Sequence, residues 1–314
     1  MREVWFYEPD FFYFTPVPYM NYSSHISPVI AGCMKWGQWG SKFSTAEYLQ
    51  MIEECLANDI TTFDHADIYG DYTTEEEFGA ALKKNPSLRS KMQIITKCGI
   101  KRLTANRPQH TIQSYDTSKE HIINSLEKSL KDFNTDYIDI LLIHRPDPLM
   151  HPDEIAEAFT HLKTQGKVLE FGVSNFTPRQ VEMIHSRFRV KYNQIEVSVI
   201  QMEPFHNGQL DQCIQHNIIP MAWSPLGAGK LLSDIEEVRN KRILAAAQFL
   251  ADKYDLNIDQ ILLAFLFTHP AIIIPVLGTT KINRLKKAME ASSLKLEREE
   301  WFMLWRASTG HEVP

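Results

Sequence analysis

The sequence has few cysteines, no long apolar run and no large excess of charge of one sign. Its four cysteines (Cys33, Cys55, Cys98 and Cys213) are spaced too irregularly for a disulfide framework or a Cys-x-x-Cys metal site, so no metal is expected. The longest apolar runs, residues 261–267 and 271–277, fall well below the roughly 18 residues that span a bilayer. The aromatic N-terminus is interrupted by Glu-Pro-Asp at 8–10 and is a poor secretory signal. A reducing cytoplasm fits these features best.

Charge of both signs is interspersed along the chain. With 33 basic and 39 acidic residues, the net charge of −6 leaves no basic face that could track a phosphate backbone. We therefore expect neither nucleic acid nor a membrane as partner. The proportions of hydrophobic (44%) and charged (23%) residues are typical of a globular protein rather than a disordered one. Nothing in them indicates an oligomeric state, and a monomer is compatible with them.

The chain also lacks the glycine-rich turn of an open dinucleotide-binding sheet. The stretch 32–37, Gly-Cys-Met-Lys-Trp-Gly, does not have the GxGxxG spacing and opens no helix. Short apolar runs instead alternate with segments of helical period throughout. Eight strands are predicted at 29–34, 60–64, 92–98, 138–144, 168–173, 194–197, 218–224 and 272–277. Helices are predicted at 45–58, 74–84, 118–133, 153–165, 178–186, 210–216, 238–254, 258–268 and 282–291.

Eight strand–helix units in strict order predict a (β/α)8 TIM barrel, with a doubly wound open sheet as the alternative. We expect residues 1–314 to form a single domain. A barrel of ordinary size needs about 250 residues, and the surplus lies in an N-terminal extension or hairpin at 1–28, in the segment 99–117, and in a C-terminal helix and tail at 294–314.

Three polar side chains mark the ends of consecutive predicted strands. Asp64, Lys97 and His144 end the second, third and fourth strands, and the C-terminal strand ends of a barrel share one face. Alone, each has an ordinary structural explanation, such as a solvated ion pair or a buried histidine. Together with a tyrosine they suit proton transfer to a carbonyl oxygen: the ammonium favours the phenolate, the carboxylate keeps the lysine charged, and the imidazole donates a hydrogen bond.

Seven motifs in this order resemble the aldo/keto reductases, over about residues 28–306, and in particular a bacterial branch of oxidoreductases. They are Phe-Asp-x-Ala-x-x-Tyr-Gly (63–70), the strand lysine, Ile-His-Arg-Pro (143–146), Gly-Val-Ser-Asn-Phe (172–176), Asn-Gln-Ile-Glu (193–196), Trp-Ser-Pro-Leu-Gly (223–227) and Leu-Gly-Thr-Thr-Lys (277–281). The resemblance implies an NADP(H)-dependent oxidoreductase that reduces aldehydes or ketones to alcohols. It implies Tyr69 as general acid, Asp64 and Lys97 as the pair that tunes it, and His144 as the residue that orients the carbonyl.

The resemblance also implies how NADP(H) is held. By motif position, Ser174, Asn175 and Gln194 bind the nicotinamide carboxamide, and Trp223 stacks on the ring. The pyrophosphate segment comprises Ser224, Leu226, Gly227 and Lys230. The 2′-phosphate segment comprises Gly278, Thr279, Thr280, Lys281 and Arg284, with hydroxyls and cations at a helix N-terminus. Lys287 and Ala288 replace the acid and asparagine that commonly hold adenine in this family.

The resemblance implies a small carbonyl compound as substrate, which the sequence does not identify further. Trp36, Trp39 and Arg145 follow predicted strands where the walls of the pocket belong. Three other functions use the same residues: an NADP(H)-binding regulatory subunit with slow turnover, a Schiff-base aldolase acting through Lys97, and a metal hydrolase using Asp64 and Asp67. The complete set of four polar residues favours the reductase, and His65 is expected to pack in the barrel wall.

Overall fold

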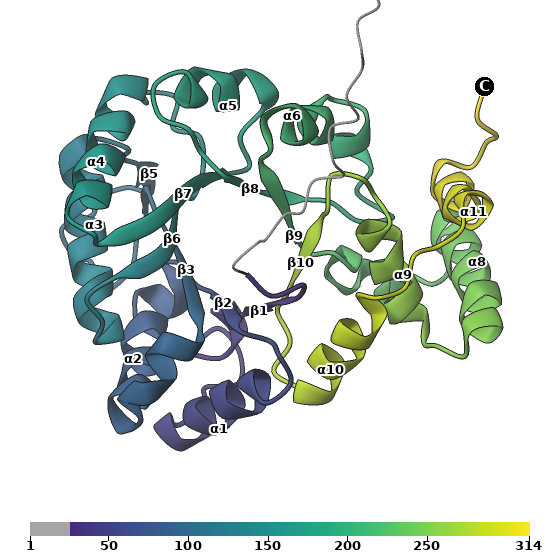
Figure 1. The fold of residues 1–314 in the computed structure, drawn as a ribbon, viewed down its shortest axis with the longest axis horizontal. Coiled ribbons are helices and arrows are strands. Elements are labelled where there is room, and N and C mark those ends of the chain that lie inside the picture. Colours follow the sequence, from purple (N-terminus) through teal and green to yellow (C-terminus); the bar gives the residue numbers. More distant parts are fainter. Residues whose placement is uncertain (1–25) are drawn as a thin grey trace, which may run out of the picture.

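The computed structural model describes residues 26–314 and has a closed barrel of eight parallel strands at its centre (Figure 1). Around the barrel the strand order is β1-β10-β9-β8-β7-β6-β3-β2, and β2 pairs again with β1. The strands are β1 (Ile30–Gly32), β2 (Thr62–Asp64), β3 (Gln93–Cys98), β6 (Ile138–Ile143), β7 (Val168–Ser174), β8 (Tyr192–Glu196), β9 (Ile219–Trp223) and β10 (Ile274–Leu277). Each predicted strand is present, so the (β/α)8 barrel is confirmed and the open sheet is wrong.

Helices surround the barrel and connect its strands (Figure 1). They are α1 (Thr45–Leu56), α2 (Thr74–Lys84), α3 (Lys119–Phe133), α4 (Pro152–Thr164), α5 (Pro178–His185), α6 (Gln209–His216), α7 (Lys230–Ser233), α8 (Val238–Tyr254), α9 (Ile258–Phe267), α10 (Ile282–Ala291) and α11 (Arg298–Thr309). Local caps set several starts: Ser118 accepts from the backbone of His121, and Thr177 forms a full capping box with Gln180. These caps define where α3 and α5 begin.

The barrel strands are almost continuously apolar because both of their faces are buried. One set of side chains fills the inside of the barrel. It comprises Ile26, Ile30, Ile95, Ile140, Leu142, Tyr192, Ile219, Met221, Ile274 and Val276. The outward faces pack against the helices in two further clusters, one of which joins α8, α9 and α11. A filled interior makes the barrel a rigid support for the side chains at its ends.

Two short strands interrupt the predicted loop at 99–117. β4 (Ile100–Lys101) and β5 (Ser114–Tyr115) pair antiparallel, with Ile100 opposite Tyr115. We refer to residues 100–115 as the β4–β5 excursion. It rises from the C-terminal end of β3 and so lies beside the residues expected to do chemistry.

The two ends of the chain contribute differently to the described structure. The predicted hairpin at 1–28 lies almost entirely outside the described residues. At the other end, α11 packs beside α8 (Figure 1), and Glu300 of α11 accepts hydrogen bonds from Lys253 and Tyr254 at 2.5 Å each.

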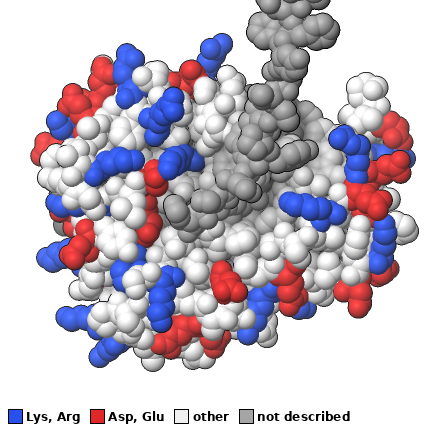
Figure 2. Space-filling model, viewed as in Figure 1, with Lys and Arg blue, Asp and Glu red and all other residues white. Residues whose placement is uncertain are grey.

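In the described part of the chain, no helix is both long and apolar enough to cross a membrane. On the face drawn in Figure 2, basic and acidic side chains are mixed around the grey region.

Candidate active site

Neighbouring strand ends bring the predicted catalytic residues together. Asp64 is the last residue of β2, Lys97 the penultimate residue of β3, and His144 directly follows β6. β3 pairs with β2 on one side and with β6 on the other, which places the three side chains next to one another. Tyr69 begins a short 3-10 turn, η2 (Tyr69–Asp71), in the connection from β2 to α2. We refer to these four residues as the tetrad.

Lys97 is at the centre of the tetrad and is 1% exposed. Its Nζ donates to both carboxylate oxygens of Asp64 at 2.8 Å, to the backbone oxygen of His65 at 2.7 Å, and to Tyr69 Oη at 3.3 Å. Burial disfavours the charged amine, but Asp64 and Tyr69 outweigh it and hold the pKa of Lys97 above its usual value. Lys97 therefore stays protonated, as the residues alone led us to expect.

The Tyr69 phenol responds to two opposing effects. Burial raises its pKa and the Lys97 ammonium lowers it, and burial prevails, so the net pKa of Tyr69 lies above its usual value. The expected influence of Lys97 is present, but it offsets only part of the cost of burying a phenolate. Tyr69 is consequently a protonated donor near neutral pH.

His144 is a neutral ring beside the phenol. Burial, together with the charges of Lys97 and Arg145, lowers its pKa well below the usual value. Its ring lies 6.0 Å from that of Tyr69, nearly perpendicular, and its backbone N–H donates to the Cys98 oxygen at 2.8 Å. Within the described residues Nδ1 has no hydrogen-bond partner. A neutral imidazole has one N–H, which it can donate to a carbonyl oxygen.

A hydrogen-bond network joins the residues expected to hold nicotinamide. Asn175 Nδ2 donates to Ser174 Oγ at 2.8 Å, and Ser174 Oγ donates to the Gln194 backbone oxygen at 2.9 Å. The Trp223 indole N–H donates to Asn175 Oδ1 at 2.8 Å, which fixes the orientation of the half-buried ring. Hydroxyl and amide groups beside an oriented aromatic face are a donor and acceptor set that fits a nicotinamide ring with its carboxamide.

Gln194 connects this network to the tetrad. Its Nε2 donates to Asp64 Oδ1 at 2.8 Å, so Asp64 accepts from both Lys97 and Gln194. The motif placed Gln194 at the carboxamide, but the residue pattern gave no sign of its bond to Asp64. Because Gln194 is 3% exposed, this bond is shielded from water and fixes the carboxylate relative to Lys97.

The turn after β9 has the conformation of a tight, irregular loop. Ser224, Gly227 and Ala228 all have positive φ, Gly227 is buried, and Leu226 packs against the core. Lys230 follows at the start of α7 and is exposed. It forms no ion pair with any other described residue, and its predicted contact with the pyrophosphate stays a prediction.

The loop after β10 brings the second predicted group together. Gly278, Thr279, Thr280 and Lys281 lead into α10, and the Lys281 N–H donates to Thr279 Oγ1 at 3.2 Å. Within residues 26–314 neither Lys281 nor Arg284 forms an ion pair, and both are exposed. Hydroxyls and free cations at this position fit a phosphate group.

The two residues that replace the usual adenine-binding pair do not form a substitute for it. Ala288 is buried in the core, and the Lys287 backbone oxygen accepts a hydrogen bond from Gln260 at 2.9 Å. The exposed Lys287 side chain is the only one of the two that a ligand could reach.

Three residues were predicted to line the substrate pocket. One of them lies elsewhere, and two lie near the tetrad. Trp36 is fully buried among Phe43, Tyr48, Phe63 and Phe78, and its indole donates to the Thr279 oxygen at 3.3 Å. The expectation that Trp36 lines the pocket is therefore wrong, because the side chain points into the core and supports the loop after β10.

Trp39 and Arg145 do lie beside the tetrad and its neighbours. The Trp39 ring lies 6.1 Å from that of Tyr69, and the Arg145 guanidinium lies 5.7 Å from the centre of the Trp223 ring. Both side chains are half-buried. Their role as walls of the substrate pocket stays a prediction.

One further residue near the tetrad was not predicted from the sequence. Arg102, in the β4–β5 excursion, pairs with Asp71 at 2.8 Å and lies 4.8 Å from the Trp39 ring centre. The only signal in the sequence was that the excursion follows β3, the strand that carries Lys97. His65, in contrast, packs as expected: its fully buried ring contacts Phe78 and Phe133 at 4.5 and 5.0 Å.

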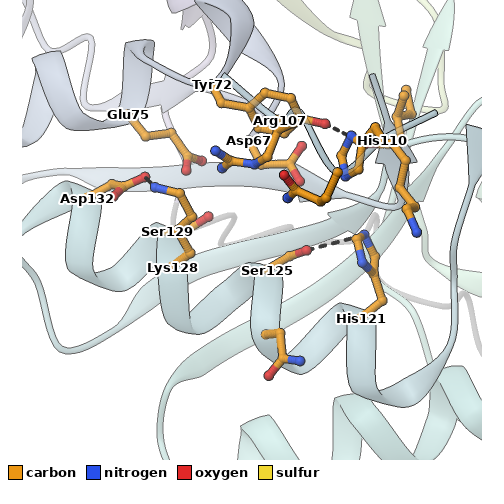
Figure 3. Close-up of a pocket in the computed structure, with 14 residues that line it drawn as sticks. Asp67, Tyr72, Glu75, Arg107, His110, His121, Ser125, Lys128, Ser129 and Asp132 are labelled. Carbon is orange, nitrogen blue, oxygen red and sulfur yellow. Dashed lines mark hydrogen bonds and ion pairs between the residues drawn. The ribbon is translucent and has the colours of Figure 1, made fainter. Parts of the chain in front are cut away.

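A separate polar cavity of about 320 Å³ lies outside the tetrad, and none of the four tetrad side chains lines it. Asp67, Tyr72, Arg107 and His110 line one part of it and polar side chains of α3 another (Figure 3). Glu75 lies in its wall, where burial raises the carboxyl pKa to about 7 against hydrogen bonds from Thr96 and Ser129. The sequence gave no indication of this cavity.

Comparison with known proteins agrees with this geometry. The family model described as "Aldo/keto reductase family" matches residues 28–307. The Bacillus subtilis oxidoreductase YcsN is 44% identical over 92% of this chain and 96% of its own, and the Escherichia coli oxidoreductase YdhF is 43% identical over 89% and 93%. An Agrobacterium fabrum protein named 6-dehydroglucose reductase is 40% identical over 92% of this chain and 96% of its own.

A solved structure shows the same fold. The thermostable aldo-keto reductase Tm1743, crystallised with the inhibitor epalrestat, superposes with a TM-score of 0.76 at 26% identity, over 90% of this chain and 95% of its own.

Proposed function

The chain belongs to the aldo/keto reductase family, and we propose that it reduces aldehyde or ketone carbonyls to alcohols with NADP(H), with Tyr69 as the general acid. One observation carries the proposal. Lys97 Nζ lies 3.3 Å from Tyr69 Oη and 2.8 Å from both Asp64 oxygens, and the side chains of Lys97 and Asp64 are buried. In this geometry Lys97 can stabilise the Tyr69 phenolate that remains after the proton has been transferred. A general acid that donates a proton in every catalytic cycle needs this stabilisation.

The roles of the four residues follow from their charges. Reduced nicotinamide supplies a hydride when it is bound. Neutral His144 donates a hydrogen bond that orients the substrate carbonyl and stabilises negative charge on its oxygen. Tyr69 donates its proton to that oxygen, and Lys97 stabilises the resulting phenolate. Asp64 keeps Lys97 charged, and Gln194 holds Asp64 in place.

The preference for NADP(H) over NAD(H) rests on Lys281 and Arg284. NADP(H) differs from NAD(H) by one phosphate, and these two exposed side chains have no carboxylate partner within residues 26–314. Ser174, Asn175, Gln194 and Trp223 would hold the nicotinamide end. The described residues thus offer complementary groups at both ends of the dinucleotide.

The substrate class remains that of small carbonyl compounds. The Agrobacterium fabrum relative, at 40% identity, is named for its action on 6-dehydroglucose. A sugar aldehyde therefore belongs in any substrate panel, beside simple aldehydes, ketones and quinones.

The test is a titration of the purified protein with NADPH and NADH, followed by a carbonyl panel monitored at the NADPH absorbance. We expect tighter binding of NADPH than of NADH, and turnover with at least one aldehyde or ketone. Tight NADPH binding without turnover on any carbonyl would contradict a reductase and favour a regulatory subunit. No binding of either nucleotide would contradict the cofactor assignment itself.

A further inference from the structure

The segment that follows Tyr69 has an unusual backbone. Gly70, Asp71 and Tyr72 are consecutive residues with positive φ, at 60°, 57° and 73°. Glycine adopts this conformation freely, but a residue with a side chain crowds its own backbone there. Asp71 and Tyr72 must therefore be held by contacts with the rest of the molecule.

A single residue of the β4–β5 excursion contacts both. Arg102 Nε donates to Asp71 Oδ1 at 2.8 Å, and the Arg102 backbone N–H donates to Tyr72 Oη at 2.9 Å. Asn106 adds a bond from its Nδ2 to the Asp71 backbone oxygen at 2.9 Å. The two strained residues next to the general acid are thus tied to an element that is distant in sequence.

The same arginine reaches the ring beside the general acid. Its guanidinium carbon lies 4.8 Å from the centre of the Trp39 ring, and the Trp39 ring lies 6.1 Å from that of Tyr69. A planar guanidinium can pair with a carboxylate through one edge while a ring packs on its face, whereas an ammonium cannot do both in the same way. Arg102 therefore bridges the Tyr69–Tyr72 turn and Trp39.

Two other side chains of the β4–β5 excursion contact Arg102 and Tyr72. His110 Nδ1 is 2.9 Å from the Arg102 backbone oxygen, and the Arg107 guanidinium lies 4.1 Å over the Tyr72 ring. Tyr72, Arg107 and His110 gather at the wall of the polar cavity (Figure 3). Contacts on both sides of Tyr72 make the turn and the excursion one packed unit.

We infer that Arg102 is a positioning residue, which fixes Tyr69 and Trp39 relative to each other by holding the left-handed turn and stacking on the indole. The inference rests on the proposed role of Tyr69. Arg102 does not touch the tetrad, so it acts through Asp71, Tyr72 and Trp39. Small displacements of a catalytic group lower rates steeply, so loss of this bridge should reduce turnover more than cofactor binding.

The test compares Arg102→Met and Arg102→Lys with Arg187→Met. Arg187 is a matched control because it forms an Arg–Asp pair with Asp153 at 2.7 Å, on the surface and away from the tetrad. In Arg102→Met we expect kcat to fall about tenfold or more, with the NADPH dissociation constant within twofold of wild type. Arg102→Lys should give an intermediate kcat, because it restores the ion pair without the planar stack. Arg187→Met should match the wild type.

Two readouts separate positioning from a loss of folding. The alkaline limb of the pH profile for reduction should move upward in Arg102→Met, because a displaced Tyr69 gains less from the Lys97 charge. Hydrogen exchange at the amides of residues 70–72 should accelerate in Arg102→Met and not in Arg187→Met. If Arg102→Met does not fold, Asp71→Asn removes the charged partner while keeping the arginine, and the same changes are expected at smaller size.

The outcomes distinguish this inference from the proposed function. Wild-type kcat, an unmoved alkaline limb and unchanged exchange in Arg102→Met would overturn the inference while leaving the reductase intact. If the wild-type protein reduces no carbonyl, the proposed function fails, and the exchange at residues 70–72 still decides whether Arg102 holds the turn.

Discussion

Asp64, Lys97 and Tyr69 form a series of contacts in which each side chain influences the protonation of the next. Asp64 and Tyr69 keep Lys97 charged despite its burial, and Lys97 opposes the rise that burial imposes on the pKa of Tyr69. Removing one member of a buried ion pair commonly costs about 3–5 kcal/mol, since the other is left as an uncompensated charge. The tetrad is therefore a cooperative unit, and its members are not expected to have additive effects on rate.

The protonation state of Tyr69 predicts opposite pH profiles for the two directions of the reaction. Reduction needs the protonated phenol, and alcohol oxidation needs the phenolate. Burial raises the pKa of Tyr69 above its usual value of about 10. The rate of reduction should therefore hold constant from neutral pH to about pH 10, while alcohol oxidation should rise over the same range. Initial rates in both directions provide the measurement, and a reduction rate that falls between pH 6 and 8 would contradict this assignment.

At the residue scale, the sequence predicted the members of the tetrad better than their surroundings. Asp64, Lys97 and His144 could be found because strand ends of a barrel share a face, which is a property of topology. Trp36 was misplaced because a position after a strand says nothing about which way a side chain points. The bond from Gln194 to Asp64 could not be found, since it joins residues 130 positions apart.

At the scale of elements, the connection from β2 to α2 carries Tyr69, the proposed general acid, next to a left-handed turn. Gly70 is required there for two reasons: its φ is 60°, and a Cβ at this position would lie 2.5 Å from Thr74 Oγ1 and 2.7 Å from Thr73 Oγ1. Both threonines precede or open α2. The turn therefore couples the position of Tyr69 to the start of the helix.

Gly70→Ala should lower both stability and turnover. We expect a loss of about 1–3 kcal/mol in the free energy of unfolding from strain and crowding, and a fall in kcat because Tyr69 is adjacent. Gly166→Ala is the matched control, since its φ is also positive, at 68°, but nothing lies within 4 Å of the added Cβ. Urea unfolding and steady-state kinetics test this. Equal losses of stability in the two variants would show that crowding at Gly70 plays no part.

Element prediction succeeded where periodicity is long and failed where it is short. The eight barrel strands are apolar runs, and the helices carry both an apolar face and capping residues such as Ser118 and Thr177. β4 and β5 have two residues each, which is too short for an alternating pattern to show. The excursion could be located as surplus length, but its contacts with Asp71 and Tyr72 depend on tertiary packing.

At the scale of the whole molecule, a chain of net charge −6 can attract the proposed anionic dinucleotide only through local positive charge. Three cations lie on the side of the barrel where β2, β3 and β6 end at the tetrad. They are Lys230 after β9, Lys281 after β10, and Arg284 near the start of α10. None of the three is neutralised by an ion pair within the described residues. Their attraction for phosphate should weaken with salt, because they are exposed.

The double variant Lys281→Met with Arg284→Met tests this electrostatic account. We expect the dissociation constant for NADPH to rise about tenfold or more, and that for NADH to change much less, because only NADPH carries the extra phosphate. Lys119→Met, which removes an exposed cation paired with Glu157 at 2.9 Å, serves as the control. Titration calorimetry at two salt concentrations is the measurement. Equal loss of affinity for both nucleotides would place these side chains elsewhere on the cofactor.

The central claim is that the Tyr69 hydroxyl is the proton donor. Its most direct test is the initial rate of NADPH oxidation with a carbonyl substrate, measured for Tyr69→Phe and for Tyr137→Phe. Tyr137, just before β6, is the control because it lies at the opposite end of that strand from His144. The account predicts that Tyr69→Phe lowers the rate at least about a hundredfold, with NADPH affinity within twofold of wild type, while Tyr137→Phe keeps the wild-type rate. A Tyr69→Phe variant that turns over as fast as the wild type would contradict it.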